Sequence, residues 1–163
     1  MLVVSDTSPL SNLAIIGKLA LLREQFSEVW MPPAVARELI ALDAPSAQAA
    51  LSEALRTGWL KEIPLPMSAP FPAELRGLDA GETEALRLAL STTTDCVLMD
   101  EKEGRQCAAN LGIRTIGVLG VLIAAKYAGS IASLHTEIEK LRRDAGFFVD
   151  RPLEARVLAL VGE

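Results

Sequence analysis

The chain has 163 residues, half of them hydrophobic, and a formal net charge of −5. The length argues against two independent domains, and the negative charge argues against a protein that holds nucleic acid through a broad basic surface. Cys96 and Cys107 stand in no CxxC pair and His135 is the only histidine, so a zinc site, a disulfide framework and a Cys–His or Ser–His catalytic pair are all unsupported.

The first part of the chain alternates short apolar runs, typical of buried strands, with segments of helical periodicity. Residues 2–5 (LVVS) predict a strand, residues 9–25 a helix and residues 28–32 (EVWMP) a second strand. Helices over 33–42 and 46–58 follow, and then a weaker strand over 59–63 (WLKEI), expected at an edge of the sheet. The start has no basic segment and meets Asp6 before any long apolar stretch, so no signal peptide is predicted.

The alternation resumes after a proline-rich segment, residues 64–77, which is expected to form an irregular surface loop at the rim of a site. The pattern then predicts a helix over 80–91, a strand over 95–99 (DCVLM), a helix over 101–112, a strand over 114–118 (RTIGV) and, after Gly120, helices only. The most apolar segment, 115–125, is interrupted by Lys126 after far fewer than the ~20 residues that span a bilayer. We therefore predict a cytoplasmic protein without a membrane span.

Strands that alternate with helices are typical of a parallel sheet covered on both faces. The predicted fold class is α/β: three layers, with a central parallel sheet of four to five strands covered by helices and a helical C-terminal cap. We expect residues 1–163 to form one domain.

Two aspartates follow predicted strands directly, Asp6 after LVVS and Asp100 after DCVLM. Ligands of such sheets bind beyond the carboxyl ends of the strands, where both residues are placed. The alternative for each is that it starts a turn or caps the next helix.

Two glutamates add to this acidic set. Glu38 falls within the buried stripe of Val35, Leu39 and Leu42, where an unpaired carboxylate is costly and needs a cation. The alternatives are a Glu at the edge of the stripe or one paired with an arginine.

Glu82 opens the helix over 80–91, and its side chain is expected on the face of Ala85, Leu86 and Ala89, which Glu84 does not share. The competing explanation is a capping arrangement with Asp79, three residues earlier, in which Glu82 only satisfies backbone donors.

Binding of Mg²⁺ would explain why four carboxylates are expected at the same edge of one sheet, because this ion prefers hard oxygen ligands and usually keeps waters. In hydrolysis with two metal ions about 4 Å apart, such ions activate a water and stabilise the leaving oxygen.

The sequence resembles the PIN-domain nucleases, the fold of VapC-type toxins of toxin–antitoxin pairs, and in particular a prokaryotic PIN-like subgroup. The resemblance covers essentially the whole chain and is carried by VVSDTSPLSNLAIIG, MPPAVARELI, GLDAGETEALRLA, VLMDEKEGRQCAANLGI, TIGVLGVLIAAKYAG, LRRDAGFF and the closing VGE. It implies a five-stranded parallel sheet, metal-dependent cleavage of RNA with Mg²⁺ or Mn²⁺, a homodimer, and inhibition by a small antitoxin whose tail enters the acidic cleft.

By this resemblance the family's catalytic quartet falls on Asp6, Glu38, Glu82 and Asp100. Asp6 and Asp100 would be the central metal ligands, with Glu82 as a third. Family members commonly have an aspartate where Glu82 stands, and the longer side chain could move a metal or favour one ion over two.

Further residues near the quartet have two interpretations each. Thr7 and Ser8 are candidates for binding the scissile phosphate or for capping a helix before Pro9, and Arg105 for binding phosphate or for a surface ion pair. Glu101 and Glu103 could supply a further metal ligand or be solvated residues of a first helical turn.

The resemblance and the acidic set together predict a metal-dependent endoribonuclease, expected to be the toxin of a toxin–antitoxin pair. One alternative is a catalytically silent PIN-like module that binds RNA or protein. Another is an aspartyl phosphoryl-transfer domain, although a phosphatase of that kind expects a second aspartate where Ser8 stands.

Overall fold

A five-stranded parallel sheet forms the centre of the computed structural model, which describes residues 1–163. The strand order is β3-β2-β1-β4-β5, and all four neighbouring pairs are parallel. The strands are β1 (Leu2–Ser5), β2 (Glu28–Met31), β3 (Leu60–Glu62), β4 (Cys96–Leu98) and β5 (Thr115–Ile116). The predicted α/β class is confirmed, and the weak strand over 59–63 does lie at an edge.

Nine α-helices surround the sheet, and a short 3-10 helix, Ala73–Leu75, lies in the irregular segment that follows β3. They are α1 (Thr7–Ile15), α2 (Ala20–Gln25), α3 (Pro33–Ile40), α4 (Pro45–Thr57), α5 (Ala80–Ser91), α6 (Lys102–Asn110), α7 (Val118–Tyr127), α8 (Leu134–Ala145) and α9 (Arg151–Leu160). The prediction of one helix over 9–25 is wrong, because the chain turns at Gly17, where φ is +71°, and continues as a second helix.

The strands contribute side chains to two separate hydrophobic clusters, because successive strand residues point to opposite faces of the sheet. Val3 belongs to a cluster of 30 buried residues that includes side chains from α1, α4, α7 and α8. Val4 belongs to one of 10 buried residues, built with α5 and α6. The three layers that the sequence predicts are therefore present. No helix is both long enough and apolar enough to cross a membrane.

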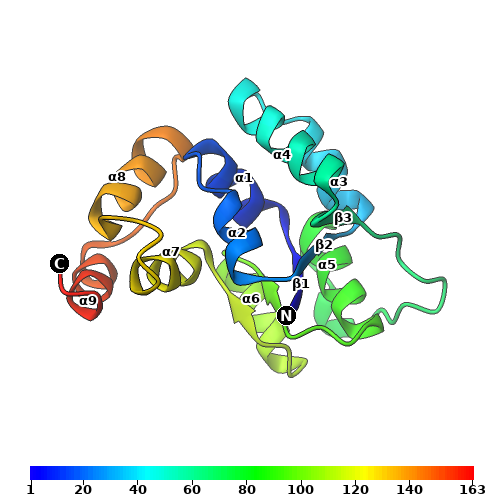
Figure 1. Cartoon of the computed structure of the whole chain (residues 1–163). Helices are drawn as coiled ribbons and strands as arrows, with labels where there is room; N and C mark the ends of the chain where they lie inside the picture. The colour runs from blue at the N-terminus through cyan, green and yellow to red at the C-terminus, as the bar shows by residue number, and fades with distance from the viewer.

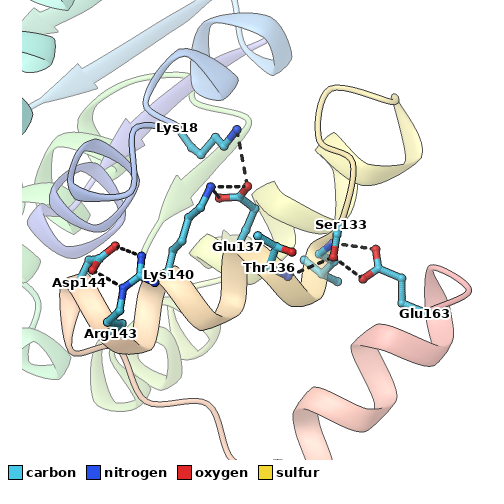
Figure 2. A network of polar contacts seen from close by, with 9 residues as sticks. Lys18, Ser133, Thr136, Glu137, Lys140, Arg143, Asp144 and Glu163 are labelled. Carbon is cyan, nitrogen blue, oxygen red and sulfur yellow. Dashed lines mark hydrogen bonds and ion pairs between the residues drawn. The ribbon is translucent and has the colours of Figure 1, made fainter.

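Helices α7, α8 and α9 form the C-terminal cap at one end of the molecule, away from α3 and α4 (Figure 1). Polar contacts fix α8 within this cap (Figure 2). Glu137 of α8 is 5% exposed and lies between the ammonium groups of Lys18, at 3.6 Å, and Lys140, at 3.0 Å.

The N-terminus of α8 is capped by Glu163, whose carboxylate accepts hydrogen bonds from the backbone N–H groups of Leu134 and His135 and from Ser133 Oγ. The ammonium group of Lys126, followed by these donors, lowers the pKa of Glu163 to about 2. Both anchors lie in the N-terminal half of α8, and the helix packs against α1 and α7.

Candidate metal centre

Asp6 lies at the carboxyl end of the central strand and is 3% exposed. Its backbone N–H donates to the Leu98 carbonyl oxygen at 2.9 Å, which fixes it against the end of β4. It occupies the N-cap position of α1, but its side chain makes no capping hydrogen bond.

Burial raises the pKa of Asp6 from 3.8 to about 7. The neighbouring backbone N–H of Thr7 opposes this effect, and the charges of Asp79, Glu82 and Glu38 add to it. The carboxyl group is therefore buried among other acids without a cationic partner.

Glu82 combines both interpretations that the sequence left open. It forms a capping box with Asp79: the Glu82 N–H donates to Asp79 Oδ1 at 2.8 Å, and the Asp79 N–H donates to Glu82 Oε2 at 3.2 Å. Its other oxygen, Oε1, is buried and has no hydrogen-bond partner. Burial is the main cause that raises its pKa. One oxygen thus starts the helix, and the second is left for a ligand.

Glu38 is exposed, so its predicted place within the buried stripe of α3 is wrong. The stripe is narrower than expected, and Glu38 lies at its edge. Its carboxylate accepts hydrogen bonds from the Thr7 hydroxyl and from the Gly81 backbone N–H, the latter at 3.1 Å. These contacts with α1 and α5 turn Glu38 towards Asp6, and they show that Thr7 binds Glu38 rather than capping its own helix.

Asp100 is half-buried and lines a hollow that shares Ser8 and Glu101 with the space around the other three acids. Its Oδ1 accepts a hydrogen bond from the Val118 N–H at 2.7 Å, and its Oδ2 accepts one from Ser8 Oγ at 3.2 Å. The Asn12 side chain donates to Ser8 Oγ at 3.1 Å. Burial raises the pKa of Asp100, and both hydrogen bonds oppose that rise. Asp100 therefore joins the start of α7 to the site.

Three of the four predicted acids line one polar pocket of about 570 Å³ that has no hydrophobic side chain in its wall. Asp100 is not among its lining residues. The full set is Asp6, Thr7, Ser8, Ser11, Glu38, Asp79, Glu82, Glu101, Lys102 and Glu103. We call this space the acidic pocket. None of its carboxylates, nor that of Asp100, has a Lys or Arg nitrogen within 4.0 Å.

Arg105 makes no ion pair, so the alternative of a surface salt bridge is not observed. Its Nη1 donates to the Met99 carbonyl oxygen at 2.9 Å, and its charge lowers the pKa of Asp100. It lines a hollow that it shares with Asp100, beside the acidic pocket and not inside it.

Three glycines that the sequence reasoning missed make room for the acids. A Cβ at Gly81 would lie 2.9 Å from both Glu38 carboxylate oxygens, one at Gly104 would lie 2.5 Å from Glu82 Oε1, and one at Gly117 would lie 2.8 Å from Asp100 Oδ1. The sequence could have indicated two of them, since Gly81 and Gly104 occupy first turns of helices. Glycine is unfavourable there unless a neighbouring group leaves no room for a side chain.

The donor set fits a hard divalent cation. Unpaired carboxylates that are crowded together and partly buried are unfavourable without a positive charge, and Glu82 Oε1 is a buried acceptor without a donor. The pocket is wide, however, because no three of its acids have ligand atoms all within 4.8 Å of one another. The side chains that meet this criterion lie elsewhere, on α8 and α9: His135, Glu139 and Glu154. Arg142 already binds both carboxylates of that second group. A wide acidic pocket suits an ion that keeps several of its waters.

Comparison with known proteins gives one match. The family model DUF3368, described as a PIN domain, matches residues 2–163. No curated protein and no solved structure matches the chain.

Proposed function

Since the chain belongs to the PIN-domain family, whose members are generally nucleases, we propose that it is a metal-dependent endoribonuclease that hydrolyses phosphodiester bonds in RNA. The observation that carries the proposal is the acidic pocket, where Asp6, Glu38 and Glu82 come from three separate elements and meet without a neutralising cation. Eight of the 14 side-chain carboxylates elsewhere in the chain have a Lys or Arg partner within 4.0 Å, whereas none of the six in the pocket, nor Asp100, has one.

Asp6, Glu82 and Asp100 are the residues that would hold Mg²⁺ or Mn²⁺. When bound, such an ion supplies Lewis-acid stabilisation of the phosphoryl oxygens and lowers the pKa of a coordinated water. The free oxygen of Glu82 and the buried carboxyl of Asp6 are fixed by α5 and β1, and the hydrogen bond from Ser8 fixes the Asp100 carboxylate in the neighbouring hollow.

Thr7 and Ser8 are committed to carboxylates through their hydroxyl groups, so their contribution to phosphate binding differs from the one predicted. Thr7 orients Glu38, and Ser8 orients Asp100. We propose that both position the acids, and that Arg105 contacts phosphate from the side of Asp100.

Incubation of the purified protein with labelled RNA tests the chemistry directly. We expect cleavage with Mg²⁺ or Mn²⁺, none in EDTA, and none with the Asp6→Asn or Asp100→Asn variants. Both substitutions keep the shape of the side chain, so the variants should stay folded. Asp43→Asn, an exposed aspartate outside the pocket, is the matched control. RNA binding by the wild type without cleavage under either ion would favour the silent module.

The toxin role, a small antitoxin as partner and a homodimer are also part of the proposal, and they are supported by the resemblance of the sequence motifs alone. An adjacent gene for a small DNA-binding protein that blocks RNA cleavage would support the toxin role. Light scattering of the purified chain would establish its molar mass in solution.

A further inference from the structure

Two more hollows adjoin the acidic pocket and a third adjoins one of these, and each shares lining residues with its neighbour. On one side, a hollow of about 490 Å³ between residues 74–78 and α6 shares Lys102 and Glu103 with the pocket. On the other side, a hollow of about 370 Å³ shares Ser8 and Glu101 with it. That hollow continues into one of about 540 Å³ through Asp100 and the two phenylalanines at 147 and 148. Together they form a continuous edge groove that crosses the carboxyl ends of the strands.

Cations without carboxylate partners lie on both sides of the acidic pocket within this edge groove. Eight of the 16 Lys and Arg side chains have a carboxylate oxygen within 4.0 Å. Three of the other eight line the groove: Arg76 and Lys102, both exposed, on one side, and Arg105 on the other. In a chain of net charge −5, these free cations are the groups that match a phosphodiester backbone on either side of the acids.

An exposed aromatic ring lies at the far part of the groove. Phe148 is 84% exposed, although the backbone on both sides of it is fixed: the Phe147 N–H donates to the Leu141 carbonyl oxygen at 3.0 Å, and Arg142 donates to the Val149 carbonyl oxygen at 2.9 Å. Phe147, beside it, is half-buried and packs on the core. The hollow that both rings line also contains Ile116, Leu119 and the side chain of Arg105. An apolar ring next to a guanidinium group is suited to the face of a nucleobase and the phosphate attached to it.

We propose that Phe148, Arg76 and Lys102 position the RNA in the edge groove. Arg76 and Lys102 contact phosphates on one side of the acidic pocket, and Phe148 stacks on an unpaired base on the other, with Arg105 at its phosphate. The proposal rests on the proposed nuclease function and names residues that would hold its substrate. Bases in a duplex are stacked on one another and present no free face to Phe148, so duplex RNA is excluded from this arrangement.

Fluorescence anisotropy with a labelled single-stranded 12-nucleotide RNA tests the stacking contact. Ca²⁺ replaces Mg²⁺, and a gel checks that the RNA stays intact. Because stacking of a base on an aromatic ring contributes substantially, we expect Phe148→Ala to weaken binding about tenfold or more, and Phe148→Trp to retain it. Phe148→Leu keeps an apolar side chain without a ring and should behave like Phe148→Ala. Phe71→Ala, another exposed phenylalanine outside the groove, should bind like the wild type.

Salt dependence tests the phosphate contacts. For single strands the slope of log K against log salt changes by about 0.7 per phosphate contact, so Arg76→Gln with Lys102→Gln should weaken binding and flatten that slope by roughly 1.4. The control is Arg23→Gln with Arg156→Gln, which removes the same charge from two exposed cations that have no carboxylate partner and lie outside the groove.

Equal affinity of the wild type and Phe148→Ala, equal losses in the two double variants, or equal binding of duplex RNA would overturn the proposal. So would a fall in molar mass of Phe148→Ala with unchanged RNA affinity, which would make this face a contact between copies of the chain. Cleavage assays keep the two proposals apart. RNA binding that depends on Phe148, without RNA cleavage, would support the groove proposal and contradict the nuclease proposal. RNA cleavage that is unchanged by substitution of Phe148 and Lys102 would support the nuclease proposal and contradict the groove proposal.

Discussion

Substitution of Asp6 by Asn should stabilise the metal-free protein at pH 8. Burial among acids raises the pKa of Asp6 from 3.8 to about 7, so ionisation of this carboxyl disfavours the folded state. One pH unit corresponds to about 1.4 kcal/mol, so the ionised carboxylate costs up to about 4 kcal/mol of folding free energy above pH 7. Asn has nearly the shape of the protonated acid and carries no charge. We therefore expect Asp6→Asn to regain much of this energy.

The sign of the effect depends on pH. Because the folded-state pKa lies above the unfolded one, the stability associated with the protonated carboxyl is fully present below pH 3.8 and is lost as the pH rises through about 7. The gain from Asp6→Asn should thus be small near pH 4 and largest at pH 8.

Urea unfolding in EDTA at pH 4.5, 6 and 8 measures this directly. The control is Asp43→Asn, which should change the unfolding free energy by less than about 0.5 kcal/mol at each pH. The reasoning is refuted if Asp6→Asn is no more stable than the wild type at pH 8, or if its gain is the same at pH 4.5.

Three further predictions follow from the same geometry. Mg²⁺ at 100 times its dissociation constant should add about 2.7 kcal/mol to the stability of the wild type, measured as a rise in Tm. It should leave the Tm of Asp6→Asn unchanged. An equal rise in Tm of both proteins would mean that the ion binds elsewhere. Gly104→Ala places a methyl group 2.5 Å from Glu82 Oε1 and Met99 Sδ and should cost about 1–3 kcal/mol in urea unfolding together with RNA cleavage. The added methyl of Gly120→Ala meets only Ile116 Cγ2, at 2.9 Å, and none of the acids, so an equal loss of RNA cleavage in both variants would contradict this reason. Glu163→Gln should lower the Tm at pH 7 by weakening the cap of α8. Since the pKa of Glu163 is lowered to about 2, the difference in Tm from the wild type should shrink as the pH falls below 4.5. A Tm difference independent of pH would argue against a charge effect.

Strand ends were the most predictable part of the site. The branched runs before Asp6 and Asp100 fix the strands, and parallel strands bring their carboxyl ends to one edge of the sheet, so both aspartates lie where the sequence placed them. Helical periodicity was less informative for Glu38. It gives the face of a helix but not the width of the contact with its neighbours, and Glu38 lies just outside that contact.

The side-chain contacts could not be read from the sequence. Asp100 does not line the acidic pocket, and its carboxylate is fixed by hydrogen bonds from Ser8 and from the Val118 N–H, both of which depend on how α1 and α7 pack. The position of Phe148 depends in the same way on the hydrogen bonds of its neighbours, from the Phe147 N–H to the Leu141 carbonyl oxygen and from Arg142 to the Val149 carbonyl oxygen. Residue type and spacing carry no information on such packing.

The central place of β1 in the sheet has a consequence during synthesis of the protein. Val3 pairs with Cys96 in β4, which is made 93 residues after it. Until then the Asp6 carboxyl has no β4 backbone beside it, and Glu82 has no α6 to bury it. The acidic pocket therefore does not exist in the nascent chain until most of the polypeptide has been translated.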